Sequence, residues 1–90
     1  MTFKIETVAG PSRLIIRLIG RFDADSLPEL EAQIASVQGS VEFEMEEVML
    51  LDVEVVRFLV ACEARGIHLR GCSAYIREWM RGQQDSGIDE

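Results

Sequence analysis

Two cysteines and one histidine are the side chains in this sequence best suited to act as soft metal ligands, or as a nucleophile with its base. Cys72 stands just before Ser73, a predicted helix start, and a helix N-terminus lowers the pKa of a nearby thiol. Cys62 and Cys72 form no CxxC motif, and the lone His68 cannot complete a zinc site of ordinary spacing. No base, metal set or phosphate loop accompanies Cys72. The sequence therefore predicts no metal, no cofactor and no enzymatic activity, with reduced thiols that behave as small hydrophobic residues.

The acidic balance of the chain limits the partners that it can bind. The 90 residues carry 16 Asp and Glu against 9 Lys and Arg, which gives a net charge of −7. A nucleic-acid binder needs a basic face to neutralise phosphates, and anionic lipid surfaces attract basic segments. We therefore expect a protein partner, with no nucleic acid and no membrane insertion. The length suits one domain with one core.

The apolar stretches indicate the compartment. Residues 1–6 alternate apolar and polar side chains, which is typical of a strand and not of a signal peptide. The longest strongly apolar stretch, Val48–Leu51, is far too short to span a bilayer. The expected location is the cytoplasm.

Four segments are predicted to be strands. Residues 3–8 and 13–19 flank a turn-forming Ala-Gly-Pro-Ser segment, so they should pair as an antiparallel hairpin. Residues 41–46 alternate strictly between apolar residues and glutamates, which is typical of a half-buried strand. Residues 67–70 form the fourth strand.

The first helix is predicted between Ser26 and Gly39. Ser26 and Glu29 have the spacing of a capping box, and a glycine commonly ends a helix. Apolar residues recur at spacings of three and four, which makes one buried face: Leu27, Leu30, Ile34 and Val37.

Two further helices follow. Residues 53–65 form a mostly apolar helix that Gly66 ends. Ser73 caps the third helix, which ends at Gly82. The inward stripe of this third helix is expected to comprise Tyr75, Ile76, Trp79 and Met80.

The order β-β-α-β-α-β-α predicts the fold class. Crossovers between parallel strands are right-handed and most often join neighbours, so we expect an α/β fold with a four-stranded mixed sheet of order 1-2-3-4 and three helices on one face. The predicted domain spans residues 1–82, and residues 83–90 are expected to form a disordered polar tail. The predicted core contains Leu14, Ile16, Leu18, Leu30, Ile34, Phe43, Leu59, Leu69 and Ile76.

The uncovered face of this sheet should place an acidic strand between two basic ones. Its predicted residues are Arg13, Arg17, Glu42, Glu44, His68 and Arg70. Opposite charges on neighbouring strands stabilise a sheet modestly. His68 is therefore interpreted as a surface partner of a glutamate and not as a catalyst.

A series of motifs runs through about two-thirds of the chain. In chain order these are Gly20-Arg21-Phe22-Asp23, the strand Val41–Met45, Leu50-Leu51-Asp52, the second helix, Gly66 with its following strand, and the third helix. Their order and spacing resemble a STAS domain, the fold of bacterial anti-sigma factor antagonists. The resemblance implies a STAS-like fold and a regulatory, non-enzymatic protein–protein interaction module.

The resemblance also implies a site. In anti-sigma factor antagonists, an Asp-Ser-Ser-Gly-like segment starts the second helix, and a kinase that is also the anti-sigma factor phosphorylates a serine there. The corresponding segment here is Asp52-Val53-Glu54-Val55, which has no hydroxyl group. Serine phosphorylation therefore should not switch this protein. The partner-interface candidates are Asp52, Val53, Glu54, Val55, Arg57 and Phe58.

Glu54 has two interpretations. It is either a permanent negative charge in the place of a phosphoserine, or only an acidic residue that stabilises the first turn of the helix.

Three functions are compatible with the sequence. The first is a module bound to an anti-sigma or kinase-like regulatory protein. The second is a STAS-like accessory subunit of a transport ATPase, which co-purification would separate from the first. The third is an enzyme that uses Cys72, which rapid alkylation at neutral pH would support. The sequence leaves the oligomeric state open.

Overall fold

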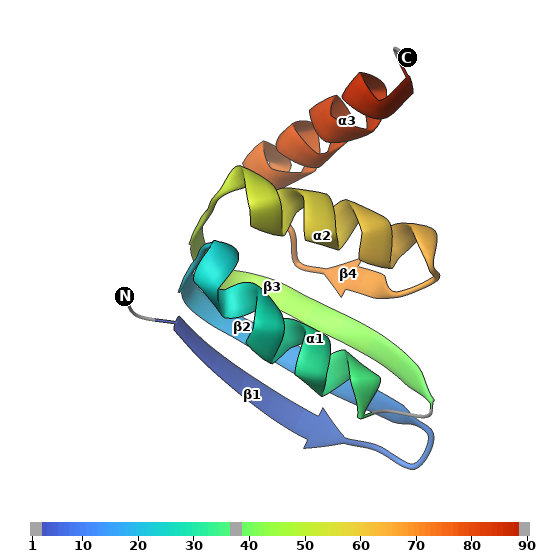
Figure 1. The fold of residues 1–90 in the computed structure, drawn as a ribbon. Coiled ribbons are helices and arrows are strands. Elements are labelled where there is room, and N and C mark those ends of the chain that lie inside the picture. The colour runs from blue at the N-terminus through green and yellow to red at the C-terminus, as the bar shows by residue number, and fades with distance from the viewer. Residues whose placement is uncertain (1–2, 37–38, 89–90) are drawn as a thin grey trace.

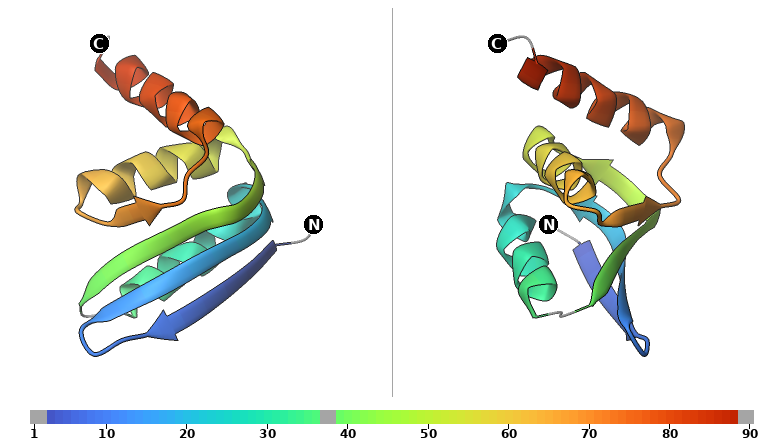
Figure 2. Two further views of the ribbon diagram at one scale, coloured as in Figure 1. Left: turned by 180° about the vertical axis from the view of Figure 1, so that it is seen from behind. Right: turned by 90° about the vertical axis from the view of Figure 1, so that its right-hand side faces the viewer.

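The structure is a computed structural model that describes residues 3–36 and 39–88. Its strands and helices, in chain order, are β1 (Phe3–Ala9), β2 (Arg13–Phe22), a 3₁₀ turn η1 (Ala24–Ser26), α1 (Leu27–Ala35), β3 (Ser40–Leu51), α2 (Val53–Ala64), β4 (His68–Arg70) and α3 (Ala74–Ile88). The strands form one sheet of order β1-β2-β3-β4. β1 and β2 are antiparallel, and the other two pairs are parallel. Helices α1 and α2 cover one face of this sheet, and α3 packs on α2 (Figures 1 and 2). The predicted fold class is confirmed.

The β1–β2 hairpin turn and the start of β3 meet closely at one end of the sheet. The Gly10 amide donates to the Arg13 carbonyl at 2.7 Å, which closes the turn. A Cβ atom on Gly39 would lie 2.6 Å from the Ser12 carbonyl oxygen, so the close approach of β3 to the turn requires glycine there. Helix α1 ends before this point. Val37, the last expected apolar position of the helix, lies outside the described residues.

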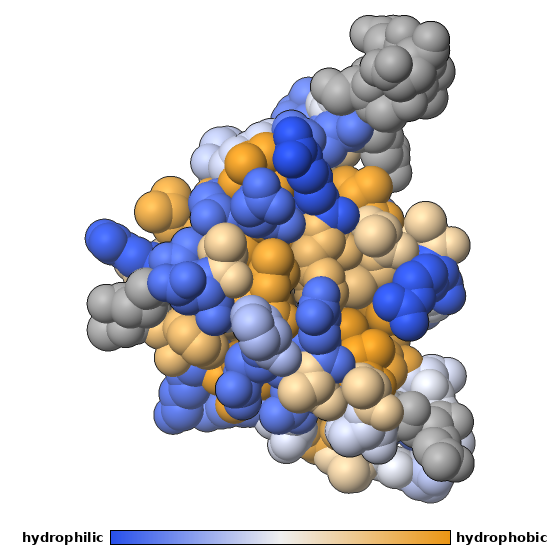
Figure 3. Space-filling model, viewed as in Figure 1, coloured by the Kyte–Doolittle hydropathy of each residue, from blue (hydrophilic) through white to orange (hydrophobic). Residues whose placement is uncertain are grey.

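The core lies between the sheet and the helices. Seven of the nine predicted core side chains are buried: Ile16, Leu18, Leu30, Phe43, Leu59, Leu69 and Ile76. The other two predictions are wrong in degree, because Leu14 and Ile34 are only partly buried. Leu14 lines a cavity beside the hairpin turn, and Ile34 lines a cleft between α1 and α2. Apolar side chains reach the surface between polar ones over this helical layer (Figure 3).

The predicted capping box at the start of α1 is wrong. The Ser26 hydroxyl is buried and donates to the Asp23 carbonyl at 2.6 Å, and it makes no capping bond to α1. The cause is the 3₁₀ turn η1, which gives Ser26 helical backbone angles already. A capping side chain needs an extended backbone to reach forward to the N–H groups of the first turn.

Helix α3 begins as predicted but extends further. The Ser73 hydroxyl accepts a hydrogen bond from the Ile76 amide at 3.2 Å. The helix then continues through Gly82 to Ile88, so the predicted helix end at Gly82 is wrong, and the segment expected to be a tail is helical as far as residue 88. A glycine inside a helix costs only about 0.5–1 kcal/mol relative to alanine. The glutamines that follow it are good helix formers, which offsets this cost.

Arg77 attaches α3 to the rest of the domain. Its guanidinium lies 2.8 Å from the Glu63 carboxylate in α2 and donates to the Leu69 carbonyl of β4 at 3.2 Å. A residue that satisfies a carbonyl of an edge strand protects that edge from pairing with other chains. Glu63, which the helical pattern of α2 did not explain, therefore anchors α3.

The predicted burial of both aromatics of α3 is half right. Trp79 is partly buried against the core, whereas Tyr75 is 59% exposed and stacks on Trp79 at 5.9 Å between ring centroids. α3 packs mainly on one helix at the end of the domain, so its covered stripe is narrow. Ile76 and Met80 occupy that stripe.

The uncovered face carries the predicted charges. Arg17 donates to Glu44 at 3.0 Å, and Arg13 and Arg70 each approach one oxygen of Glu42 at 3.6 Å. That Glu42 oxygen is buried and makes no hydrogen bond in the described structure, so these two contacts are ion pairs without hydrogen bonds. His68 stands opposite Glu42 in the register. The ion pairs that the structure shows for Glu42 involve the arginines, which corrects the role predicted for His68.

Candidate functional site

Asp52 organises the junction between β3 and α2. One carboxylate oxygen accepts the Val55 amide at 3.1 Å and so caps α2. The other accepts the Ala24 amide at 3.1 Å, and the Asp52 amide donates to the Phe22 carbonyl at 3.1 Å. One residue therefore fixes the start of α2 and ties it to the connection between β2 and α1.

The other predicted site residues lie on the first two turns of α2. Glu54 is exposed, and its carboxylate lies 3.7 Å from the Arg57 guanidinium. Val53 is partly exposed, and Phe58 is partly buried with its ring 6.4 Å from that of Phe43. Val55 is fully buried, so it supports this surface from beneath.

Arg57 connects this surface to α3. Its Nε donates to the Gln83 side-chain oxygen at 3.1 Å. The far part of α3 therefore runs beside the first turns of α2, and the same Arg57 side chain faces both Gln83 and Glu54.

Met49 and Leu50 are candidate site residues that the sequence reasoning missed. Met49 is 75% exposed and Leu50 is 49% exposed, and the buried Leu51 separates them from the Asp52 cap. The β2–β3 register shifts twice, between Arg17 and Ile19 and again between Gly20 and Arg21. Each shift is a β-bulge that inserts an extra residue into β3 and re-aims its side chains. The available signal was the loss of alternation after Met45, where two glutamates precede four apolar residues.

We call the exposed residues around the α2 start the junction surface: Met49, Leu50, Val53, Glu54 and Arg57. The exposed apolar side chains of Met49 and Leu50 come shortly before the α2 start, and Glu54 and the Asp23–Asp25 segment, which the Ala24–Asp52 hydrogen bond ties to that start, add negative charge. Exposed apolar side chains together with charged ones are the composition of a protein-binding patch. A partner for it would present apolar side chains with basic residues around them.

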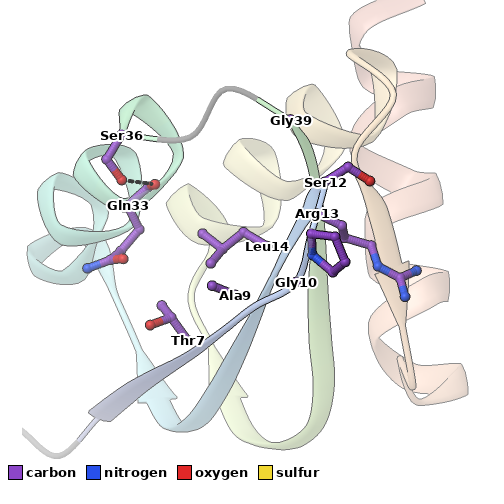
Figure 4. A pocket seen from close by; sticks show the side chains of 10 residues that line it. Thr7, Ala9, Gly10, Ser12, Arg13, Leu14, Gln33, Ser36 and Gly39 are labelled. Atoms are coloured by element: carbon purple, nitrogen blue, oxygen red, sulfur yellow. Dashed lines mark hydrogen bonds between the residues drawn. The ribbon is translucent and has the colours of Figure 1, made fainter.

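A sizeable cavity lies elsewhere. It has a volume of about 600 Å³ and is lined by the hairpin turn, the end of β1 and the last turn of α1 (Figure 4). It is at the start of β3, whereas the junction surface is at its end. Thr7, Gln33 and Ser36 are among the residues that line it, and the Ser36 hydroxyl donates to the Gln33 carbonyl at 2.9 Å, while the Arg13 side chain extends away from the cavity. The side chains that line it offer no nucleophile paired with a base.

The two cysteines have raised pKa values, whereas an activated thiol has a lowered pKa. Burial raises the pKa of Cys62 to about 11, and burial also raises the pKa of Cys72. Both are free thiols. Within residues 3–36 and 39–88, no three His, Cys, Asp or Glu side chains are grouped to hold a metal ion. No helix in this part of the chain is long and apolar enough to cross a membrane.

Cys72 is therefore expected to react slowly with alkylating agents. Because only the thiolate is nucleophilic, a raised pKa lowers the reactive fraction at pH 7–8. Iodoacetamide labelling followed by mass spectrometry should show Cys72 reacting more slowly than the same thiol in the urea-unfolded protein. A faster reaction in the folded state would revive the enzyme hypothesis.

No protein-family model matches the chain, and no curated protein does. Among solved structures, it resembles the anti-sigma factor antagonist SpoIIAA in its unphosphorylated form, with a TM-score of 0.62 and 20% sequence identity. The match covers 89% of this chain and 82% of that one. The fold is STAS-like. At this identity the likeness concerns the fold, and the function has to be argued from the site.

Proposed function

We propose that this protein is a cytoplasmic, non-enzymatic regulatory module of the anti-sigma factor antagonist type, which binds a protein partner through the junction surface. The observation that carries the proposal is the exposure of Met49 and Leu50 shortly before the capped start of α2. Large apolar side chains that remain exposed together on a small acidic domain indicate an interaction site. The STAS-like fold supports a protein partner.

The proposal includes the absence of a phosphorylation switch at this place. The α2 start from Asp52 to Val55 contains no serine or threonine, and Glu54 supplies a negative charge in the first turn. A carboxylate there is stabilised by the helix dipole, typically by about 0.3–1 kcal/mol. A phosphoserine would carry about −1.5 to −2 charges, so glutamate supplies part of that charge permanently. The partner surface would then be held in the state that phosphorylation produces in anti-sigma factor antagonists, in which a kinase-type anti-sigma factor is not bound.

The test is to compare Glu54→Ala and Glu54→Ser in binding to the partner captured from the native host and then purified. Glu78→Ala is a matched control, because Glu78 is also exposed and paired with an arginine three residues on, Arg81. We expect both Glu54 variants to bind at least several-fold more weakly by calorimetry, and the Glu78 variant to bind normally. If the Glu54 variants are folded and bind as the parent does, Glu54 only stabilises the helix.

The identity of the captured protein also matters. An anti-sigma factor or a kinase-like regulator supports the regulatory role, but capture of a kinase-type anti-sigma factor would contradict the interpretation of Glu54 as a stand-in for phosphoserine. A transport ATPase subunit would instead assign the protein as an accessory subunit of that transporter.

A further inference from the structure

The uncovered face of the sheet carries a row of alternating charges. The strand registers pair Glu6 with Arg17, Arg17 with Glu44, and Glu44 with Arg70. Read from β1 to β4, the signs are minus, plus, minus, plus. We call these four residues the charge row. Arg17 contacts both of its neighbours, at 3.4 Å to Glu6 and 3.0 Å to Glu44. Figure 2 (left) looks onto the face that carries them.

Such a row is complementary to its own reverse. We propose that this face binds a second copy of the same chain. The two copies are related by a two-fold axis that lies between the two facing sheets, parallel to the strands and level with the gap between β2 and β3. The rotation reverses the order of the strands but keeps the rows in register. Glu6 then lies opposite Arg70 of the second copy, and Arg17 lies opposite Glu44 of the second copy. Each contact occurs twice, as in any two-fold interface.

Partly exposed aliphatic side chains beside the charge row also favour the binding of a second copy. Ile15 and Ile19 lie two residues before and after Arg17, so all three share one face of β2. Both isoleucines are partly exposed, and Val8, the register partner of Ile15, is 56% exposed. Sheets that pack face to face cover such side chains and cross at about 30°. The face of a four-stranded sheet is small, so the interface falls below about 1,200 Å², in the class of weak, reversible contacts.

The pair Glu6 and Arg70 gives a clean test, because the two side chains belong to opposite edges of the sheet. Three strand spacings of about 4.8 Å separate their strands within one chain. This exceeds the Debye length of about 8 Å at physiological ionic strength, so their direct coupling within one monomer is small. Any strong coupling between positions 6 and 70 therefore reports contact between two copies.

The experiment uses two charge reversals, Glu6→Arg and Arg70→Glu, in sedimentation equilibrium at increasing concentration. The parent protein should dimerise reversibly. Each variant alone should dimerise at least about ten-fold more weakly, because reversal creates two like-charge contacts. An equimolar mixture of the two variants should associate again. The Glu6→Arg substitution of the first variant then faces the Arg70→Glu substitution of the second, and the unchanged Arg70 of the first variant faces the unchanged Glu6 of the second. Glu31→Arg, an exposed reversal on the helical layer, should leave dimerisation unchanged.

Three results would overturn the inference: a parent protein that stays monomeric at every concentration, single variants that dimerise as the parent does, or a mixture that does not associate. Thermal melts test whether each variant is folded. The mixing experiment can be interpreted as long as both variants are folded. The substituted positions lie on β1 and β4 and are not residues of the junction surface, so dimerisation and partner binding are measured separately.

Discussion

Replacing Phe43 with alanine is expected to lower the free energy of unfolding by about 3–5 kcal/mol. Phe43 is fully buried in β3, between its register partners Ile16 and Leu69, and its ring lies near that of Phe58. Truncation removes the buried ring and leaves a cavity that rigid strands on both sides cannot close. Domains of this size are stable by only about 5–15 kcal/mol in total, so the variant should be near unfolding.

Urea denaturation followed by circular dichroism measures this loss. Tyr75→Ala is the control, because it removes an aromatic ring that is mostly exposed. We expect it to change the free energy of unfolding by less than about 1 kcal/mol. A loss below about 1 kcal/mol for Phe43→Ala would contradict the register of β3.

The second large effect is expected at Asp52. Asp52→Ala removes the cap of α2 and the acceptor of the Ala24 amide together. Loss of a cap costs about 0.5–2 kcal/mol, and a hydrogen bond to a charged group is worth about 1.5–3 kcal/mol. Because the Ala24 contact is exposed, we expect the two losses together to lower the free energy of unfolding by a value near the lower end of these ranges, about 2 kcal/mol.

The Asp52→Asn variant separates the two contacts. Its amide keeps one oxygen acceptor but replaces the other oxygen with a donor, so it should lose part of the stability that the alanine variant loses. Hydrogen exchange should show faster exchange of both the Val55 and the Ala24 amides in Asp52→Ala. Unchanged exchange at Ala24 would show that Asp52 does not tie α2 to the β2–α1 connection.

Much of the fold follows from local patterns. The period-two alternation from Val41 to Met45 identifies β3 and its buried side, because strand side chains alternate whatever lies around them. The Ser73 cap and the glycine after α2 are likewise local signals, and Gly66 has the positive φ of 93° that glycine tolerates best. Strand order followed from the rules for parallel crossovers.

The errors arise where distant segments decide the outcome. The bulges that expose Met49 and Leu50 depend on the register with Gly20 in β2, which no local pattern encodes. Tyr75 is exposed because none of the described elements covers that side of α3. Ser26 is a local exception, because the 3₁₀ turn that it ends gives it helical backbone angles. The candidate site at Asp52 and Glu54 therefore stays a prediction from the sequence, and the exposed Met49 and Leu50 close to it became visible only in three dimensions.

The most direct test of the account is the binding of the purified partner to Leu50→Glu, with Val8→Glu as the matched control. Both residues are aliphatic and about half exposed, and they lie at opposite ends of the sheet. A charge in an apolar contact centre removes favourable burial and places an unpaired carboxylate there, so Leu50→Glu should bind at least about ten-fold more weakly. At concentrations where the chain is monomeric, Val8→Glu should bind as the parent does. Equal binding by Leu50→Glu and the parent would show that the junction surface is not the partner site.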